Sequence, residues 1–146
     1  MRKACRRRVV VPMPPRGLRP RLDAGQVIDL SICHNSNLDS IARGDANDTT
    51  LWHWAESVFT WSNVAELMDV GVPEMEAQLT LTAAVIERFN ATGRIVFTGP
   101  EYQLAKDGVC VMDQLAEIVD RPTALMAVEW SRAKLQALAV AGREAA

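Results

Sequence analysis

The sequence predicts an all-α protein: a compact bundle of four long helices plus one or two short ones, preceded by an extended basic N-terminal arm. Three observations support this fold class. Apolar residues recur at helical spacing in long segments, helix start and stop signals separate these segments, and the connections are short, about two to six residues, which favours antiparallel neighbours. We divide the chain into an arm (residues 1–22), a single helical domain (23–141) and a frayed C-terminus (142–146).

The apolar pattern of residues 50–70 predicts the central helix, and this segment contains three of the four tryptophans. At helical spacing, one apolar stripe comprises Leu51, Trp54, Val58, Trp61, Ala65 and Met68. The opposite, polar face comprises His53, Glu56, Thr60 and Asn63. Further apolar side chains lie outside the stripe, so this helix needs neighbours on two or three sides. Asn63 is either solvated on the polar face or buried with hydrogen-bond partners.

The segment before the central helix predicts two shorter helices. Asp23 is a suitable N-cap for the first, and its apolar pattern weakens at residues 34–37. A second short helix over residues 37–43 then ends at Gly44. Asp48 or Thr49 is the predicted N-cap of the central helix.

Three further helices follow the central one. Gly71 and Pro73 mark its end and the start of a helix over residues 73–92, and residues 94–97 form a packed connector. Thr98 and Glu101 match a capping box, which begins a helix that runs to about residue 119. After a break at residues 120–122, a last helix ends near Ala141. The inward-facing residues predicted for the last two helices are Leu104, Val111 or Gly108, Leu115, Ile118, Leu125, Val128, Leu135 and Leu138.

Composition argues against membrane insertion, export and metal binding. No apolar run approaches the roughly 20 residues of a transmembrane helix, and the basic N-terminus lacks the apolar core of a signal peptide. We therefore expect a cytoplasmic protein without membrane contact. The three cysteines, Cys5, Cys33 and Cys110, show no C-x-x-C spacing, so neither a disulfide framework nor a thiolate zinc site is predicted. We expect no metal and no cofactor.

The sequence shows no catalytic constellation. It has two histidines, His34 and His53, and it lacks the H-E-x-x-H, G-x-S-x-G, Walker A and G-x-G-x-x-G patterns. His53 lies on the polar face of the central helix, where we expect a solvated side chain. We therefore expect a non-enzymatic protein with no catalytic residues.

Charge is distributed very unevenly along the chain. Residues 1–21 carry eight basic and no acidic side chains, whereas the rest holds the other eight basic and all 18 acidic side chains, a net charge of −10. The arm has three interpretations: a free tail, a segment docked on its own acidic body or on a second copy, or an element that contacts nucleic-acid phosphates. Its candidate contact residues are Arg2, Lys3, Arg6, Arg7 and Arg8.

Four acidic residues crowd the junction between the central helix and its successor: Glu66, Asp69, Glu74 and Glu76. No basic residue occurs between Arg43 and Arg88. These carboxylates form either a solvated acidic surface or a patch that binds a basic partner.

The stretches WHWAESVFTWSNVAELM (residues 52–68) and IERFNATGRIVFTGPEYQLAKDGVCVMDQLAEI (residues 86–118) follow the Arg- and Pro-rich arm. Together they resemble a group of small uncharacterised helical proteins encoded by bacterial phages and mobile elements, over roughly residues 1–130. The shared marks are the basic arm, the aromatic helix and a T-G-R…T-G-x-E link. The resemblance implies a context in which small proteins bind host machinery, anti-CRISPR inhibitors being one kind. It assigns no functional residue.

We therefore expect an interaction protein that binds and modulates a host protein complex, for example a CRISPR effector, by occupying a basic nucleic-acid-binding surface. Its expected contacts are Glu66, Asp69, Glu74 and Glu76. The alternative is a nucleic-acid-binding accessory protein that places its arm on phosphates. Homo-oligomerisation is left open, because an aromatic-rich helix can leave an apolar face for a second copy.

The alternative function makes a direct prediction. If the arm binds phosphates, the affinity of the chain for DNA or RNA should fall steeply with added salt, because bound counterions are released. Deletion of residues 1–21 should abolish that binding. Filter binding or fluorescence anisotropy across a salt series measures both effects, and binding that survives the deletion would exclude the arm as the contact.

Overall fold

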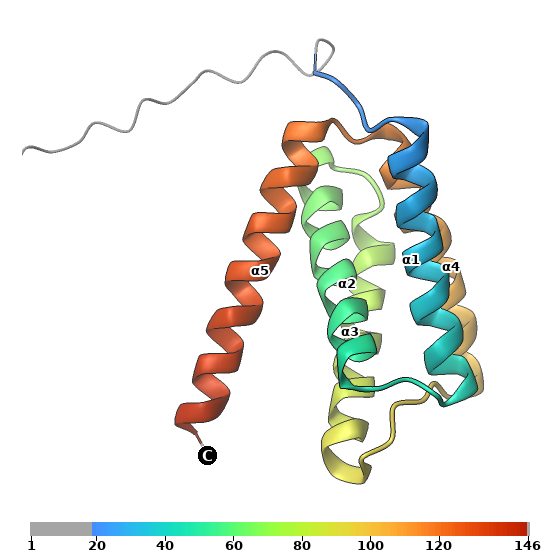
Figure 1. Ribbon diagram of the computed structural model, residues 1–146, viewed down its shortest axis with the longest axis vertical. Helices are drawn as coiled ribbons and strands as arrows, with labels where there is room; N and C mark the ends of the chain where they lie inside the picture. The colour runs from blue at the N-terminus through green and yellow to red at the C-terminus, as the bar shows by residue number, and fades with distance from the viewer. Residues whose placement is uncertain (1–18, 146) are drawn as a thin grey trace, which may run out of the picture.

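Five long helices make up the described part of the chain, residues 19–145 of the computed structural model (Figure 1). They are α1 (Ala24–Arg43), α2 (Asp48–Met68), α3 (Val72–Thr92), α4 (Gly99–Ile118) and α5 (Arg121–Glu144). Within these residues the only pairing of β type is an isolated bridge between Arg21 and Asp120. The prediction of an all-α fold is confirmed. Most of the predicted basic arm lies outside the described residues.

The number of helices differs from the prediction, because α1 is one 20-residue helix where the sequence predicted two shorter ones. The apolar pattern weakens at His34, yet this side chain is buried and continues the inward face with Leu38 and Ile41. Asn35 is exposed and bonds the Ser31 carbonyl one turn earlier (2.9 Å). Polar residues whose hydrogen bonds are satisfied do not interrupt a helix, although they interrupt its hydropathy pattern.

The central position predicted for the Trp-rich helix is confirmed. Helix α2 packs against each of the other four helices, α1 and α3 also pack on α4, and α5 packs on α2 only. Figure 1 shows α5 diverging from the other helices toward its C-terminus. No helix in the described part of the chain is long and apolar enough to cross a membrane.

The apolar stripe of α2 is buried as predicted at Leu51, Trp54, Val58, Trp61 and Ala65, and Met68 is half-buried. The predicted polar face is wrong at Thr60, which is buried against α5. Its hydroxyl lies 2.7 Å from the hydroxyl of Ser131. His53 is exposed and Asn63 is half-buried. The pattern missed Thr60 because a hydroxyl can be buried when a second hydroxyl faces it.

Most of the predicted helix ends are confirmed. Asp23 and Thr98 each form a capping box, and Gly44 and Gly93 end their helices in the left-handed conformation. The N-cap of α2 is Asn47, not Asp48 or Thr49, because its side-chain oxygen accepts the amide hydrogen of residue 50 at 3.0 Å. Helix α5 runs to Glu144, three residues beyond the predicted end.

The inward faces of α4 and α5 are corrected by the structure. Leu115 is buried as predicted, but Leu104 and Ile118 on α4, and Leu125 and Leu138 on α5, are exposed. Half of the buried residues of α4 are small (Ala105, Gly108 and Ala116), and so are all three buried residues of α5 (Thr123, Ala127 and Ser131). Small side chains let neighbouring helices approach closely, and a search for large apolar residues overlooks such contacts.

Gly108 permits the contact between α3 and α4. The side chain of Gln78 lies across it and donates from Nε2 to the Leu104 carbonyl (2.9 Å), while Gln78 Oε1 has no hydrogen-bond partner among the described residues. A Cβ atom added at residue 108 would overlap the Gln78 side-chain amide. The glycine therefore serves packing, not backbone conformation.

Substitution of Gly108 by alanine should lower the free energy of unfolding by about 1–3 kcal/mol, because overpacking outweighs the gain in helix propensity. The matched control is Gly142→Ala in α5, where an added Cβ meets no atom within 4 Å. The control should leave stability unchanged or raise it by up to about 1 kcal/mol. Chemical denaturation of both variants measures the difference, and equal stabilities would contradict this account of Gly108.

Candidate functional site

The acidic corner, which we define as Glu66, Asp69, Glu74 and Glu76, lies where α2 turns into α3. Helix α2 ends with Asp69 in the left-handed conformation (φ 55°), and Gly71 adopts the same conformation before α3 begins. All four carboxylates are exposed. None of them forms an ion pair with any other residue that the structure describes.

The acidic corner also exposes apolar surface. Leu67 is 36% exposed and Val70 is 44% exposed, and both lie between the acidic positions of the turn. Glu74 faces this turn, since its carboxylate lies 4.0 Å from the position of a Cβ built on Gly71. Glu76 follows two residues later on α3 and therefore points to a different side of that helix. The turn is thus an apolar centre bordered by three carboxylates, with Glu76 at its edge.

The described start of the arm lies at the same end of the bundle as the acidic corner (Figure 1). The Arg19 guanidinium lies 3.8 Å from the Asp120 carboxylate, and the Pro20 carbonyl accepts the Arg121 amide hydrogen at 2.7 Å. Burial opposes the ionisation of Asp120, but hydrogen bonds from Thr123 and the charge of Arg19 outweigh it and lower the pKa of this carboxyl. The chain is therefore anchored where it enters α1. The predicted contacts Arg2, Lys3, Arg6, Arg7 and Arg8 lie outside the described residues.

A partly buried polar cluster joins α1, α2 and α4, and nothing in the sequence pattern indicates it beyond the histidine itself. The Trp61 indole donates to His34 Nε2 at 3.0 Å. Because Nε2 is thereby an acceptor, Nδ1 carries the hydrogen and donates to Asp113 Oδ1 at 3.2 Å. The Ser31 hydroxyl donates to the other oxygen of Asp113 at 2.9 Å. Burial lowers the pKa of His34, and Asp113 offsets this only in part, so the ring is neutral at pH 7.

Ser31, His34 and Asp113 do not have the arrangement of a hydrolytic triad. In such a triad the imidazole lies between the hydroxyl and the carboxylate. Here the hydroxyl and the imidazole both bind the carboxylate, and the second ring nitrogen is occupied by Trp61. The cluster therefore orients helices, and His34 has no free nitrogen with which to activate a nucleophile. Within residues 19–145, no three His, Cys, Asp or Glu side chains gather as metal ligands would.

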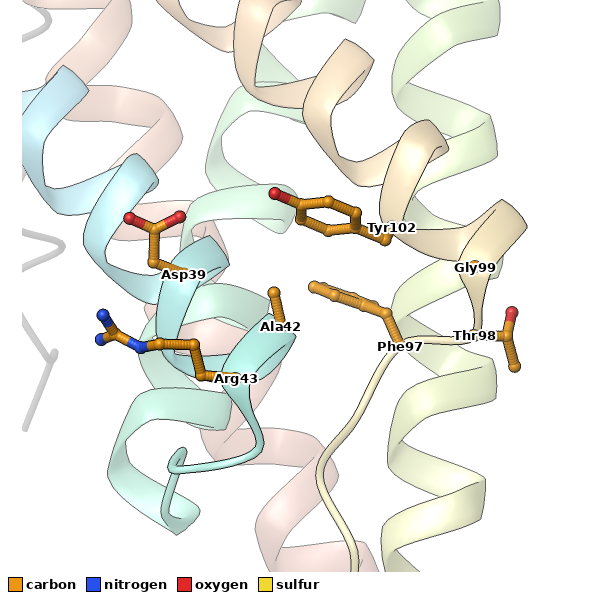
Figure 2. A pocket seen from close by; sticks show the side chains of 7 residues that line it. All are labelled: Asp39, Ala42, Arg43, Phe97, Thr98, Gly99 and Tyr102. Atoms are coloured by element: carbon orange, nitrogen blue, oxygen red, sulfur yellow. The ribbon is translucent and has the colours of Figure 1, made fainter.

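The surface formed by residues 19–145 is hollowed beside α1. A groove of about 790 Å³ separates α1 from α5, with Trp61 and Val64 of α2 among its lining residues. A second hollow of about 590 Å³ lies between the end of α1 and the start of α4. Figure 2 shows the rings of Phe97 and Tyr102 facing this space, with Asp39 and Arg43 on its other side. The groove between α1 and α5 is lined by two buried polar side chains, His34 and Thr60, and both already form hydrogen bonds within the protein.

No protein-family model, no curated protein and no solved structure matches the chain. The resemblance to proteins of phages and mobile elements therefore stays a prediction.

The buried histidine makes stability depend on pH. The pKa of His34 is lowered from its ordinary value of 6.5 in the folded state, so below that pH the unfolded chain binds more protons than the folded chain. The free energy of unfolding should therefore fall as the pH drops below 6.5, by at most about 1.4 kcal/mol per pH unit. His34→Gln should remove this slope, whereas His53→Gln, at an exposed position, should keep it. Urea unfolding between pH 5 and 8 measures the slopes, and a slope that persists in His34→Gln would assign it to another group.

Proposed function

We propose that this chain is a non-enzymatic interaction protein that binds a basic partner protein through its acidic corner. One observation carries the proposal: exposed Leu67 and Val70 lie among carboxylates that have no ion-pair partner within the described residues. Exposed charges of one sign around an apolar centre suit a surface that attracts a partner of opposite charge. Burial of the apolar centre would then supply affinity.

The partner that fits this surface is a protein with a lysine- and arginine-rich groove or channel. Such grooves hold nucleic acid, and an acidic protein that occupies one competes with the phosphate backbone. This chemistry agrees with the context expected from the resemblance, a phage or mobile-element protein that modulates a host complex such as a CRISPR effector. The proposal identifies the chemistry of the partner, not the complex.

The alternative, an accessory protein that binds nucleic acid through its arm, is favoured by one observation, the eight basic residues among residues 1–21. Two observations weigh against it. The rest of the chain carries a net charge of −10 and would be repelled by a polyanion. Arg19, the first basic residue that the structure describes, lies against Asp120 of the chain itself.

Reversal of the four acidic-corner charges to lysine should abolish binding to a basic probe. We suggest a fluorescently labelled amphipathic helical peptide of lysine and leucine, measured by anisotropy. The four-lysine variant should lose about tenfold or more in affinity, with unchanged helical content by circular dichroism. Pull-down from host lysate with and without nuclease then identifies the natural partner, which should survive nuclease and be absent from the variant lane.

The matched control reverses four exposed acidic residues elsewhere on the body: Asp39, Glu87, Asp107 and Glu117. Both variants have the same net charge, so they differ only in where the charges lie. The control should bind the peptide nearly as well as the natural sequence. Equal losses in both variants would mean that net charge, not the acidic corner, governs binding, and the proposal would fail.

A further inference from the structure

Helix α5 carries two apolar faces. One face packs on α2 through Ala127 and Ser131, which are fully buried. The other face comprises Met126, Trp130, Ala133, Ala137 and Val140, which we call the outer seam. Every member of the outer seam is exposed, including Met126 (46%), Trp130 (41%) and Val140 (54%). Within the described residues α5 packs against no helix other than α2, so no described helix covers this seam. The Lys134 ammonium lies over the Trp130 ring, 5.6 Å from its centroid.

The outer seam has the spacing of a coiled coil. Its members are separated by four, three, four and three residues, which is the alternation of the two core positions of a heptad. At 1.5 Å per residue the seam is about 22 Å long. A helix with a single neighbour does not require a second apolar stripe on its solvent side. A helix that pairs with another helix requires such a stripe at this spacing.

The flanking charges indicate that the covering helix is the same helix of a second copy. Glu129 precedes Trp130 in the position that borders one side of the seam, and Lys134 borders the other side. In a parallel pair of identical helices, Glu129 of each copy lies beside Lys134 of the other. In an antiparallel pair Glu129 would face Arg143, but the two copies of Lys134 would face each other. The parallel arrangement has the better charge complementarity.

We propose that two copies of this chain associate through the outer seams of their α5 helices, arranged in parallel. The interface is isologous, with Met126, Trp130, Ala133, Ala137 and Val140 of each copy meeting their equivalents. Two heptads make a short seam, so the dimer should dissociate on dilution. The proposal is independent of the acidic corner, which lies on other helices.

Sedimentation equilibrium of the full chain over a wide concentration range tests the dimer. We expect a reversible monomer–dimer equilibrium, and Trp130→Glu should raise its dissociation constant by about tenfold or more. The matched control is Trp52→Glu, at a tryptophan of α2 that is 51% exposed, which should leave the equilibrium unchanged. Reversal of the four acidic-corner charges should also leave the monomer–dimer equilibrium unchanged. The two proposals can therefore fail independently of each other.

Charge-swap variants test the orientation. Glu129→Lys should weaken the dimer, and the double variant Glu129→Lys with Lys134→Glu should restore it only if the helices are parallel. Restoration by Glu129→Lys with Arg143→Glu would overturn the parallel arrangement. A chain that stays monomeric at every concentration would overturn the proposal, and so would a seam that another protein covers in place of a second copy. A dimer that persists in the Trp130→Glu variant would overturn it as well.

Discussion

The structure depends on the burial of α2, and most buried polar side chains of α2 find a hydrogen-bond partner on a neighbouring helix; Ser62 Oγ is the exception within residues 19–145. Trp54 donates to Thr82 of α3 (3.2 Å), Trp61 donates to His34 of α1 (3.0 Å), and Thr60 meets Ser131 of α5 (2.7 Å). An unpaired buried donor costs about 1–3 kcal/mol. A buried side-chain hydrogen bond therefore ties the central helix to each of three neighbours, and each bond fixes the rotation of that neighbour as well as its distance.

Small residues set how closely the helices approach, and this determines which surfaces are left open. Gly108 allows Gln78 to lie between α3 and α4, and Ala127 with Ser131 brings α5 against α2. Because α5 uses its small residues on the inside, its large side chains Met126 and Trp130 face outward. The outer seam is thus exposed because of how α5 packs on α2. Its coiled-coil spacing suits it to the proposed pairing with a second copy.

The two proposed contact surfaces differ in physical character. The acidic corner combines four carboxylates, three of which border a small apolar centre, so it attracts a partner at long range and its affinity depends on salt. The outer seam is apolar with charges only at its borders, so its affinity depends on packing. A protein with both can pair with itself on one surface and bind a basic partner on the other, which would present two acidic corners in one assembly.

The sequence by itself determined the helical class, the central place of the Trp-rich helix, most helix ends and the crowding of four carboxylates at one turn. These features are local, since apolar periodicity, caps and turn residues act within a few positions of one another. Tertiary structure decided that α1 is continuous, that Thr60 is buried and that Leu125 and Leu138 are exposed. Each of these outcomes depends on what a residue meets from another helix: Asp113 lies 79 positions from His34, and Ser131 lies 71 positions from Thr60. A hydropathy pattern counts the polarity of a side chain but not its distant hydrogen-bond partner, and for this reason the polar contacts of the core became visible only in the fold.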